Sequence, residues 1–266
     1  MSWAGLKDRN AVTQQWFGVH LPGMQVLAEW PINEQFKVLE HTFNSRKLRV
    51  GAIESNFFRL RISDLKADAH RLQQRLAVIA EQGVPNYFGE QRFGRNGNNL
   101  HMAQALLVDA QRFKKADQSM TISAARSYVF NQVLDQRIQS GLFNRVQAGD
   151  ALMLDKTKSL FVAAPEDLSD LQQRLDSGDC HTSCVMPGTG QGLATGAALE
   201  WEHAQLEPYA DWLSGLERLR VCSSRRASRL LLEEFHWQFD GDDLLLEFKL
   251  PTGAYATSVL REFLAY

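Results

Sequence analysis

The sequence is poor in cysteine and has no long apolar run. Its three cysteines are an odd number with no apolar leader before them, which favours a reducing compartment over a disulfide-bonded secreted fold. No apolar stretch approaches the roughly 20 residues that a membrane-spanning helix needs. These absences predict a cytoplasmic protein without a membrane segment.

The sequence also lacks a strong net charge, an internal repeat and a low-complexity segment. Its 29 Lys and Arg residues nearly balance 31 Asp and Glu residues, for a net charge of −2, so bulk charge does not indicate a nucleic-acid partner. Cations nevertheless gather locally, at 46–49, at Arg59 and Arg61, and at 218–229. Charge segregated in this way can steer RNA to one face of a neutral protein, although most single arginines are ordinary solvated side chains.

The chain does contain enough apolar material for a well-buried core. A hydrophobic content of 44% and a charged content of 23% are typical of soluble globular domains, and 266 residues suffice for two of them. An amphipathic helix is predicted from about residue 65 to Gly83, which ends it. Alternating apolar residues before it predict strands at 13–21, 34–40, 46–51 and 56–62.

The middle of the chain has a different pattern, and its end returns to strands. Helical periodicity predicts helices at 100–113, 123–138, 167–175 and 197–219, with short strands at 151–154 and 160–163. Further on, strands at 235–239 and 244–250 flank Asp240-Gly241, a hairpin signal, and a last helix follows 251–253. Strands on both sides of a mixed block predict one domain inserted into another.

An acidic residue near the start, Asp8, stands between the cations Lys7 and Arg9. Gly5 before it and an alternating apolar run after Thr13 predict a tight loop that leads into a strand. Neighbouring cations favour the ionised form of an Asp, which suits a nucleophile or a stabiliser of an oxocarbenium ion better than a general acid. An Asp flanked by cations in a loop is also ordinary solvated surface.

The whole block around Asp8 resembles a known catalytic motif. Residues 5–16, Gly-Leu-Lys-Asp-Arg-Asn-Ala-Val-Thr-Gln-Gln-Trp, are similar to the motif of the TruD family of tRNA pseudouridine synthases, in which the Asp is the nucleophile. Further blocks resemble the family in the same order, at 46–49 with Phe58, at 83–94, at 123–127 with 130–132, and at 250–262. The resemblance therefore extends from end to end of the chain.

The resemblance implies an α+β protein: a pseudouridine-synthase fold, with a mixed and mostly antiparallel sheet and flanking helices, that carries an inserted α/β TRUD domain. We accordingly expect the catalytic domain at 1–81 and 230–266, and the inserted domain at 82–229. The resemblance also implies an isomerase that modifies tRNA at position 13 of the D-arm. We expect it to need no cofactor, metal or protein partner and to act as a monomer.

Four side chains take direct roles by this resemblance. Asp8 is the catalytic carboxylate, Asn56 and Phe58 match positions that hold and stack the target base, and Tyr255 stands where the family commonly has Phe. Asn56 and Phe58 also share one face of their predicted strand, so both can line one pocket. Because other apolar residues share that face, Phe58 taken alone would be interpreted as a core aromatic.

Supporting roles are assigned to Lys7, Asn86, Gln91, Arg92 and Arg126. Lys7 could orient Asp8, meet a phosphate or be a solvated neighbour. The three residues at 86–92 belong to a turn-rich segment that the resemblance assigns to shaping the site or contacting RNA, while Asn86 could equally serve a turn. Arg126 lies on a predicted helix, where an internal ion pair and a contact with RNA are both open.

Two other segments suggest ligands with weak support. Cys180, His181 and Cys184 are possible zinc ligands, yet a structural site needs a fourth and their spacing is not a standard pair, so thiols without a metal are expected. Residues 188–192, Gly-Thr-Gly-Gln-Gly, lack the Gly-Lys-Ser/Thr and the βαβ context of a phosphate loop. We expect a plain loop there.

The resemblance begins at residue 1, whereas family members carry a segment before this motif that adds strands and an aromatic to the catalytic domain. We therefore expect this chain to lack that segment, which leaves a second hypothesis: a catalytically impaired RNA-binding or tRNA-folding protein that retains Asp8. A third hypothesis is a carboxylate hydrolase of a nucleoside or glycan, with Glu54 as the second acid. Turnover on tRNA separates the first hypothesis from the others.

Overall fold

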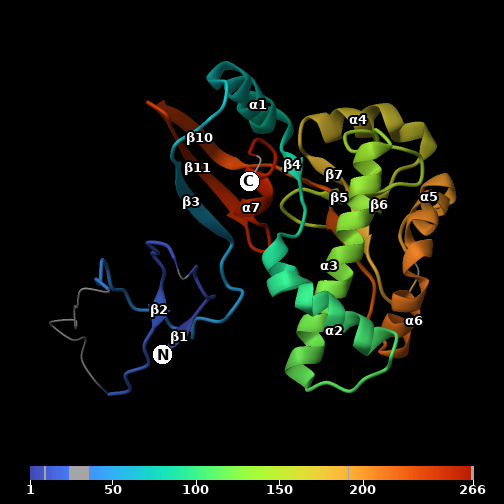
Figure 1. The fold of residues 1–266 in the computed structure, drawn as a ribbon, viewed down its shortest axis with the longest axis horizontal. Coiled ribbons are helices and arrows are strands. Elements are labelled where there is room, and N and C mark those ends of the chain that lie inside the picture. Colours follow the sequence, from blue (N-terminus) through green and yellow to red (C-terminus); the bar gives the residue numbers. More distant parts are fainter. Residues whose placement is uncertain (9, 24–35, 191, 265–266) are drawn as a thin grey trace. The chain divides into compact units, whose positions relative to one another are not determined.

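The structure is a computed structural model that describes residues 1–8, 10–23, 36–190 and 192–264 (Figure 1). The chain separates into two compact units, Met1–Asn56 and Phe57–Tyr266. Helices and antiparallel sheets occur together, which confirms the α+β class. No helix among the described residues has the length and apolar content to cross a membrane.

The first unit has little regular structure. Strands β1 (Ser2–Trp3) and β2 (Phe17–Gly18) pair antiparallel. The longer strands predicted at 13–21 and 46–51 are wrong, because only Phe17–Gly18 is extended in the first and the second is irregular. The prediction at 34–40 starts outside the described residues, and its described part, 36–40, forms no strand.

The loop that replaces the predicted strand at 46–51 has a physical explanation. Alternating apolar residues form a strand only where a neighbouring strand takes up the backbone hydrogen bonds. Here the Ala52 N–H bonds back to the Arg49 carbonyl at 3.1 Å, and the Gly51 N–H donates to the Ala4 carbonyl at 2.8 Å. These backbone groups are therefore satisfied by a local turn and by a bond to a distant loop, without a neighbouring strand.

Strands from both ends of the sequence form one sheet in the order β10-β11-β3. Its members are β3 (Ser55–Ile62), β10 (Glu233–Asp240) and β11 (Asp243–Pro251). The strand predicted at 56–62 and the hairpin predicted around Asp240-Gly241 are confirmed. Asp240 lies opposite Asp243, and Gly241 has a positive φ of 60°, which the two-residue turn requires.

Helices α1 (Ala69–Gln82) and α7 (Ala256–Leu260) pack with this sheet. Helix α1 begins later than predicted because the Asp68 carboxylate accepts the N–H groups of His70 and Arg71 and caps the helix. It ends at Gly83, where φ is +73° and a Cβ would lie 2.4 Å from the Leu230 carbonyl oxygen. Only glycine meets both conditions. Apolar residues from α1, β11 and α7 share one cluster, including Leu72, Leu76, Ile79, Leu244, Leu246, Phe248 and Val259.

A second sheet has the order β6-β5-β7-β8, with every pair antiparallel. Its strands are β5 (Ala151–Leu154), β6 (Leu160–Val162), β7 (Cys180–Met186) and β8 (Ser224–Ala227). The short strand β4 (Val84–Pro85) pairs with β9 (Arg229–Leu230). Strands β5 and β6 were predicted, whereas β7 and β8 were not. Nearly every residue of β7 is buried, so its sequence has no alternation of polar and apolar residues.

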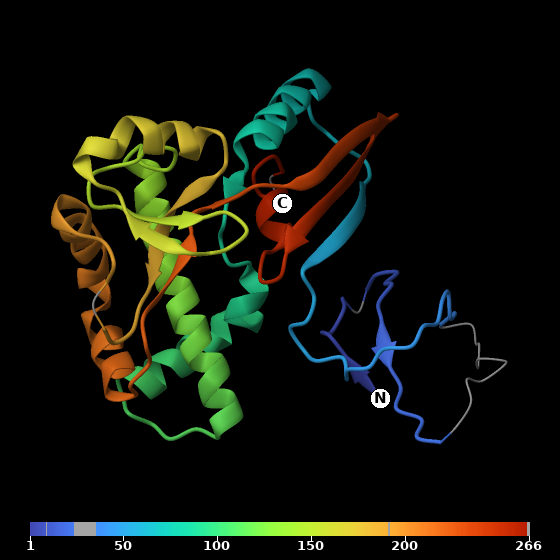
Figure 2. The same cartoon turned by 180° about the vertical axis from the view of Figure 1, so that it is seen from behind.

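Helix α3 (Lys115–Gln139) runs across one face of this second sheet, in front of it in Figure 1 and behind it in Figure 2. Residues of α3 pack with Cys184 of β7 in one cluster, while Leu171 and Leu175 of α4 pack with Cys180 in another.

The predicted helix at 197–219 is broken in two by a turn, Glu207–Tyr209, that contains Pro208. The other helices here are α2 (Asn98–Leu107), α4 (Leu168–Asp176), α5 (Gly196–Leu206) and α6 (Ala210–Arg218). Short 3₁₀ turns lie at Glu90–Phe93, Arg95–Gly97 and Pro165–Asp167.

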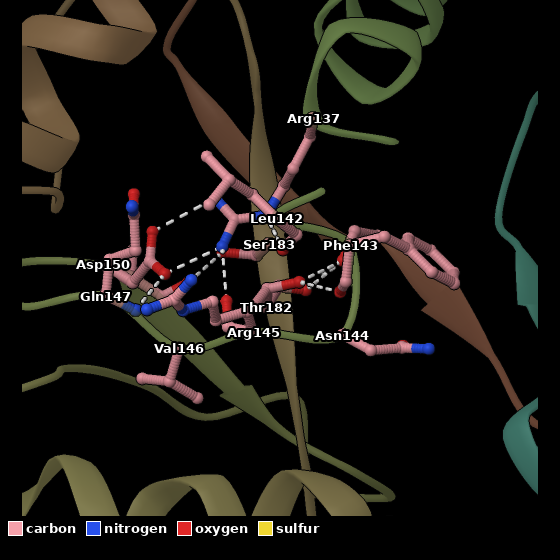
Figure 3. A network of polar contacts seen from close by, with 12 residues as sticks. Arg137, Leu142, Phe143, Asn144, Arg145, Val146, Gln147, Asp150, Thr182 and Ser183 are labelled. Atoms are coloured by element: carbon pink, nitrogen blue, oxygen red, sulfur yellow. Dashed lines mark hydrogen bonds and ion pairs between the residues drawn. The ribbon is translucent and has the colours of Figure 1, made fainter. Parts of the chain in front are cut away.

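A buried ion pair ties the end of α3 to the start of β5 (Figure 3). Arg137 donates to both carboxylate oxygens of Asp150, at 3.0 and 2.7 Å, and both side chains are almost fully buried. The same guanidinium donates to the carbonyls of Leu142 and Arg145. The loop between helix and strand is therefore wrapped around one cation. The expected inserted domain, 82–229, contains this whole arrangement, and its boundaries stay a prediction.

His181 on β7 is buried between two charged groups. Its Nδ1 accepts from Arg229 Nε at 3.2 Å, so its Nε2 carries the proton and donates to Asp155 Oδ1 at 3.0 Å. The pKa of His181 is lowered, mainly by burial and also by the positive charge of Arg229. The Asp155 and Asp179 carboxylates raise it by a smaller amount. A second proton on the ring would face the Arg229 N–H.

We predict that acid destabilises the protein through His181. Because the folded-state pKa lies below the unfolded value of about 6.5, the unfolded chain takes up the proton first, and stability is lost as pH falls through that range. His181→Gln keeps a donor and an acceptor but cannot be protonated. The stability advantage of the wild type over this variant, measured by urea unfolding, should shrink between about pH 7.5 and about pH 5.5. An advantage that stays constant across this interval would contradict the assignment.

Candidate active site

The loop around Asp8 is fastened to the start of β3 by one hydrogen bond. Lys7 Nζ donates to Asn56 Oδ1 at 2.6 Å, and both side chains are half-buried. Asp8, the next residue, is exposed. Because Oδ1 accepts from a cation, the amide of Asn56 is oriented with Nδ2 as its donor end. Lys7 thus holds Asn56, which is predicted to bind the base, and the proposed catalytic residue Asp8 directly follows Lys7 in the chain.

Phe58 lies on the sheet with its ring against the core. Its ring stacks on that of Phe248, with centroids 5.5 Å apart and planes 24° apart. Phe248 is fully buried, whereas Phe58 is only half-buried. Its neighbours Phe57 and Arg59 face solvent, so the predicted alternation of this strand is confirmed. A half-buried aromatic with a rigid backing is a suitable platform for stacking.

Tyr255 lies just before α7, and its ring packs against a different core cluster. The ring meets Phe88 edge-on, with centroids 5.9 Å apart, and Phe88 in turn meets Phe130 of α3 edge-on at 5.5 Å. Gly89 makes room for this contact, since a Cβ there would lie 3.0 Å from Tyr255 Cδ1. Tyr255 is therefore set by the residues at 88–89.

Asn86 is buried and has an internal role. Its backbone N–H donates to the Ser228 carbonyl at 2.8 Å, and its Nδ2 donates to the Ala227 carbonyl at 3.0 Å. Its Oδ1 and its backbone carbonyl both accept from Arg226, at 2.5 and 3.1 Å. The side chain thus joins the loop at 86–89 to β8 rather than facing solvent.

Among the other supporting candidates, Gln91 is exposed, while Arg92 and Arg126 form hydrogen bonds inside the protein. Arg92 donates to the hydroxyls of Ser123 and Ser127 on α3, and its guanidinium lies 5.7 Å from the Phe88 ring centroid. Arg92 therefore belongs to the same surroundings as Phe88 and Tyr255.

Arg126 binds neutral oxygen atoms. It donates to three carbonyls and to the Ser224 hydroxyl, at 2.8–3.1 Å. Burial lowers its pKa, because nothing among these partners compensates the charge as a carboxylate would. The sequence left two roles open for Arg126, an internal ion pair and a contact with RNA. The structure shows an internal role, in which the partners are carbonyl oxygens and not a carboxylate. The accepting carbonyls are those of Met186, Pro187 and Cys222.

Within the cations at 218–229, the three on β8 and β9 do not form the surface patch that the sequence suggested, whereas Arg218 and Arg220 are exposed. Arg225 pairs with Glu202 at 2.6 Å, with both side chains buried, and Arg229 is buried against His181. Arg226 lies over the Phe88 ring. The reason is that β8 and β9 run through the interior, where β8 pairs with β7 and β9 with β4.

The remaining cation groups differ in whether carboxylates neutralise them. Arg59 pairs with Glu247, and Arg61 pairs with both Asp240 and Asp243. Exposed cations at 46–49 have no ion pair with a carboxylate of the described residues. These are Arg46, Lys47 and Arg49. Exposed cations without such pairs thus occur in the unit that contains Asp8, and others, such as Lys156 and Lys158, occur in the second unit.

The segments that suggested other ligands have structural roles. Cys180 and Cys184 are buried in separate clusters, and burial raises the pKa of Cys184 to about 12. No group of three or more potential metal ligands occurs among the described residues. At Gly188 a Cβ would lie 2.3 Å from the Val221 carbonyl oxygen, so that glycine serves a close backbone approach. Glu54 is exposed.

Comparison with known proteins decides the family. A family model described as tRNA pseudouridine synthase D (TruD) matches residues 1–117 and 109–263. The chain belongs to the TruD family of tRNA pseudouridine synthases. The resemblance carried by the motif around Asp8 is thereby confirmed, and with it membership of a family of isomerases.

Relatives named tRNA pseudouridine synthase D align with nearly the whole chain. Those of Aeromonas salmonicida and Aeromonas hydrophila are 45% and 44% identical, and each alignment covers 99% of this chain and 75% of the relative. The Proteus mirabilis protein is 40% identical over 99% of this chain and 76% of its own length. A TruD crystal structure from Methanosarcina mazei has a TM-score of 0.61 at 20% identity, covering 82% of this chain and 70% of that one. This last similarity supports the TruD fold.

We predict that Asn86 and Gln91, equal candidates from the sequence, differ sharply in their effect on stability. Asn86→Ala removes a buried amide and leaves the Ala227 carbonyl and an Arg226 N–H without partners, which should cost about 2 kcal/mol of unfolding free energy. Gln91→Ala changes an exposed side chain and should cost less than about 0.5 kcal/mol. Urea denaturation of the two variants provides the measurement. Equal losses would show that Asn86 is not the internal tie described above.

Proposed function

We propose that this TruD-family protein isomerises uridine to pseudouridine at position 13 of the tRNA D-arm, with Asp8 as the nucleophile. The observation that carries the proposal is the hydrogen bond from Lys7 to Asn56. It couples the loop that bears an exposed carboxylate to an amide suited to a uracil edge. The family motif across 5–16 supports the same roles.

The reaction needs a carboxylate and a pocket, and no redox partner. The C1′–N1 bond breaks, the base turns, and a C1′–C5 bond forms, while the proton lost from C5 balances the proton gained at N1. An ionised Asp8 can act as a nucleophile toward the reacting nucleotide.

The target nucleotide must leave its stack before it can react, and three side chains are suited to receive it. Nδ2 of Asn56 can donate to a uracil carbonyl, since its Oδ1 is directed at Lys7. Phe58 offers a ring backed by Phe248, and Tyr255 offers a second ring where the family commonly has Phe. Stacking on an aromatic ring contributes about 1–3 kcal/mol per base.

Affinity for tRNA is supported by exposed cations in the unit that contains Asp8. Arg46, Lys47 and Arg49 are exposed and free of ion pairs with described carboxylates. Phosphate contacts from such residues release counterions and make binding dependent on salt. A protein with a net charge of −2 can thus bind RNA through a local patch.

We expect Asp8→Asn to abolish pseudouridine formation while tRNA affinity changes less than about twofold, because the amide keeps the size of the side chain and removes its charge. The measurement is mapping of pseudouridine in tRNA after incubation with enzyme, with modification expected at position 13. Asp64→Asn is the matched control: Asp64 is exposed, and its positive φ of 58° is one that Asn tolerates. Turnover of the Asp8 variant near that of the parent, or a parent without turnover on tRNA, would overturn the proposal.

A second expectation concerns salt. Replacing Arg46, Lys47 and Arg49 together by Gln should make the log–log plot of tRNA affinity against salt less steep by about 2 units, at roughly 0.7–0.9 per lost phosphate contact. Replacing Arg59 and Arg61 by Gln changes net charge in the same direction, yet these residues already pair with carboxylates. That variant should leave the slope nearly unchanged. Equal slopes in both variants would show that the patch does not contact phosphate.

A further inference from the structure

Arg226 occupies an unusual position between two loops. From β8 its Nε donates to the Asn86 carbonyl at 3.1 Å, and one Nη donates to Asn86 Oδ1 and to the Gly253 carbonyl, at 2.5 and 3.0 Å. Its guanidinium carbon lies 4.1 Å from the Phe88 ring centroid. One side chain therefore holds the loop at 86–89 and the loop at 251–255 together.

None of these partners is a carboxylate. Burial lowers the pKa of Arg226 to about 10, because no carboxylate compensates the charge of the buried cation. Two other buried arginines, Arg137 and Arg225, are each paired with an acid, whereas Arg229 donates to His181 and to backbone carbonyls. A buried cation held by carbonyls stabilises the fold poorly by its charge, so its contribution lies in the backbone that it fixes.

The backbone held in this way carries the ring proposed to stack on the uridine. Gly253, whose carbonyl accepts from Arg226, is two residues before Tyr255. Phe88, on which the guanidinium stacks, contacts the edge of the Tyr255 ring. Arg226 therefore acts on Tyr255 from two directions, through the backbone before it and through the ring beside it.

We propose that Arg226 is a positioning residue for the base pocket: its guanidinium clamps the 251–255 loop onto Asn86 and Phe88 and so sets the ring of Tyr255. This inference rests on the proposed function, in which Tyr255 stacks on the target uridine. The clamp needs a planar fork that donates in several directions while its face covers a ring. A lysine keeps the charge and supplies neither.

The test is a double-mutant cycle between Arg226 and Tyr255. Arg226→Lys should lower kcat about tenfold at saturating tRNA and leave the Kd for tRNA within about twofold, because charge is kept. Tyr255→Ala removes the ring itself. If Arg226 acts through Tyr255, the double variant should be no slower than Tyr255→Ala within about twofold. Losses that multiply would overturn the inference.

A control variant separates positioning from general loss of stability. Leu171→Ala creates a cavity beneath α4, in a cluster that contains neither Arg226 nor Tyr255, and should lower stability by about 2–5 kcal/mol. Assayed well below its Tm, it should keep the kcat of the parent. A similar loss of kcat in this variant would show that the effect of Arg226→Lys is only one of stability.

Amide hydrogen exchange tests the clamp without any turnover. In Arg226→Lys the amides at 252–255 should exchange at least about tenfold faster than in the parent, while Leu171→Ala leaves them at the parent rate. A parent that forms no pseudouridine would overturn the proposed function, and exchange would still decide whether Arg226 holds this loop. Unchanged exchange in Arg226→Lys would overturn the inference whatever the activity.

Discussion

Buried guanidinium groups impose the constraint on which the second unit depends. An arginine inside a protein must find acceptors for its N–H groups and must have its charge compensated or tolerated. Arg137 and Arg225 meet both demands with carboxylates, Asp150 and Glu202. Arg226 meets only the first, with carbonyl and amide oxygens. These two solutions have different consequences for the molecule.

The arginines paired with acids connect regular elements. Arg137 joins the end of α3 to the start of β5, and Arg225 joins β8 to α5 through Glu202. Breaking such a pair leaves a buried charge without a partner and is strongly destabilising, although the pair itself adds little net stability over an apolar contact. Their effect is therefore to determine which elements pack together.

Arg226, which is held by carbonyl and amide oxygens, fixes loops instead. Carbonyl acceptors belong to the backbone, so a guanidinium that binds several of them specifies a path of the chain that sequence periodicity does not. The loops held in this way include 251–255, which carries Tyr255. A binding site requires a well-defined backbone path of this kind, because its side chains must be held in position by rigid neighbouring residues.

Sequence patterns predicted the parts of the fold that depend on local periodicity. The strand β3, the β10–β11 hairpin and the apolar face of α1 follow from alternation, from Asp240-Gly241 and from helical spacing that ends at Gly83. The patterns did not predict β7, which is buried throughout. In the first unit they predicted a strand at 46–51, where the backbone hydrogen bonds close a turn and reach the Ala4 carbonyl without forming a ladder.

The candidate site was predictable where a motif carried it and not where tertiary contacts did. The block around Asp8 and the positions of Asn56 and Phe58 could be found from sequence, since they depend on residue type and order. The hydrogen bond from Lys7 to Asn56 joins residues far apart in sequence, so no local pattern contains it. Arg226 was visible only as one cation among several at 218–229.

The same contacts explain why net charge is a poor guide for this protein. The value of −2 counts Arg225 and Arg137 equally with Arg46, yet the first two are neutralised by buried acids and cannot reach a ligand. What a polyanion meets is the charge that is both exposed and unpaired. In the described part of the chain such charge includes the cations at 46–49, which are close in sequence to Asn56 and in the same unit as Asp8. The net charge of a chain therefore does not tell which of its cations a polyanion can reach.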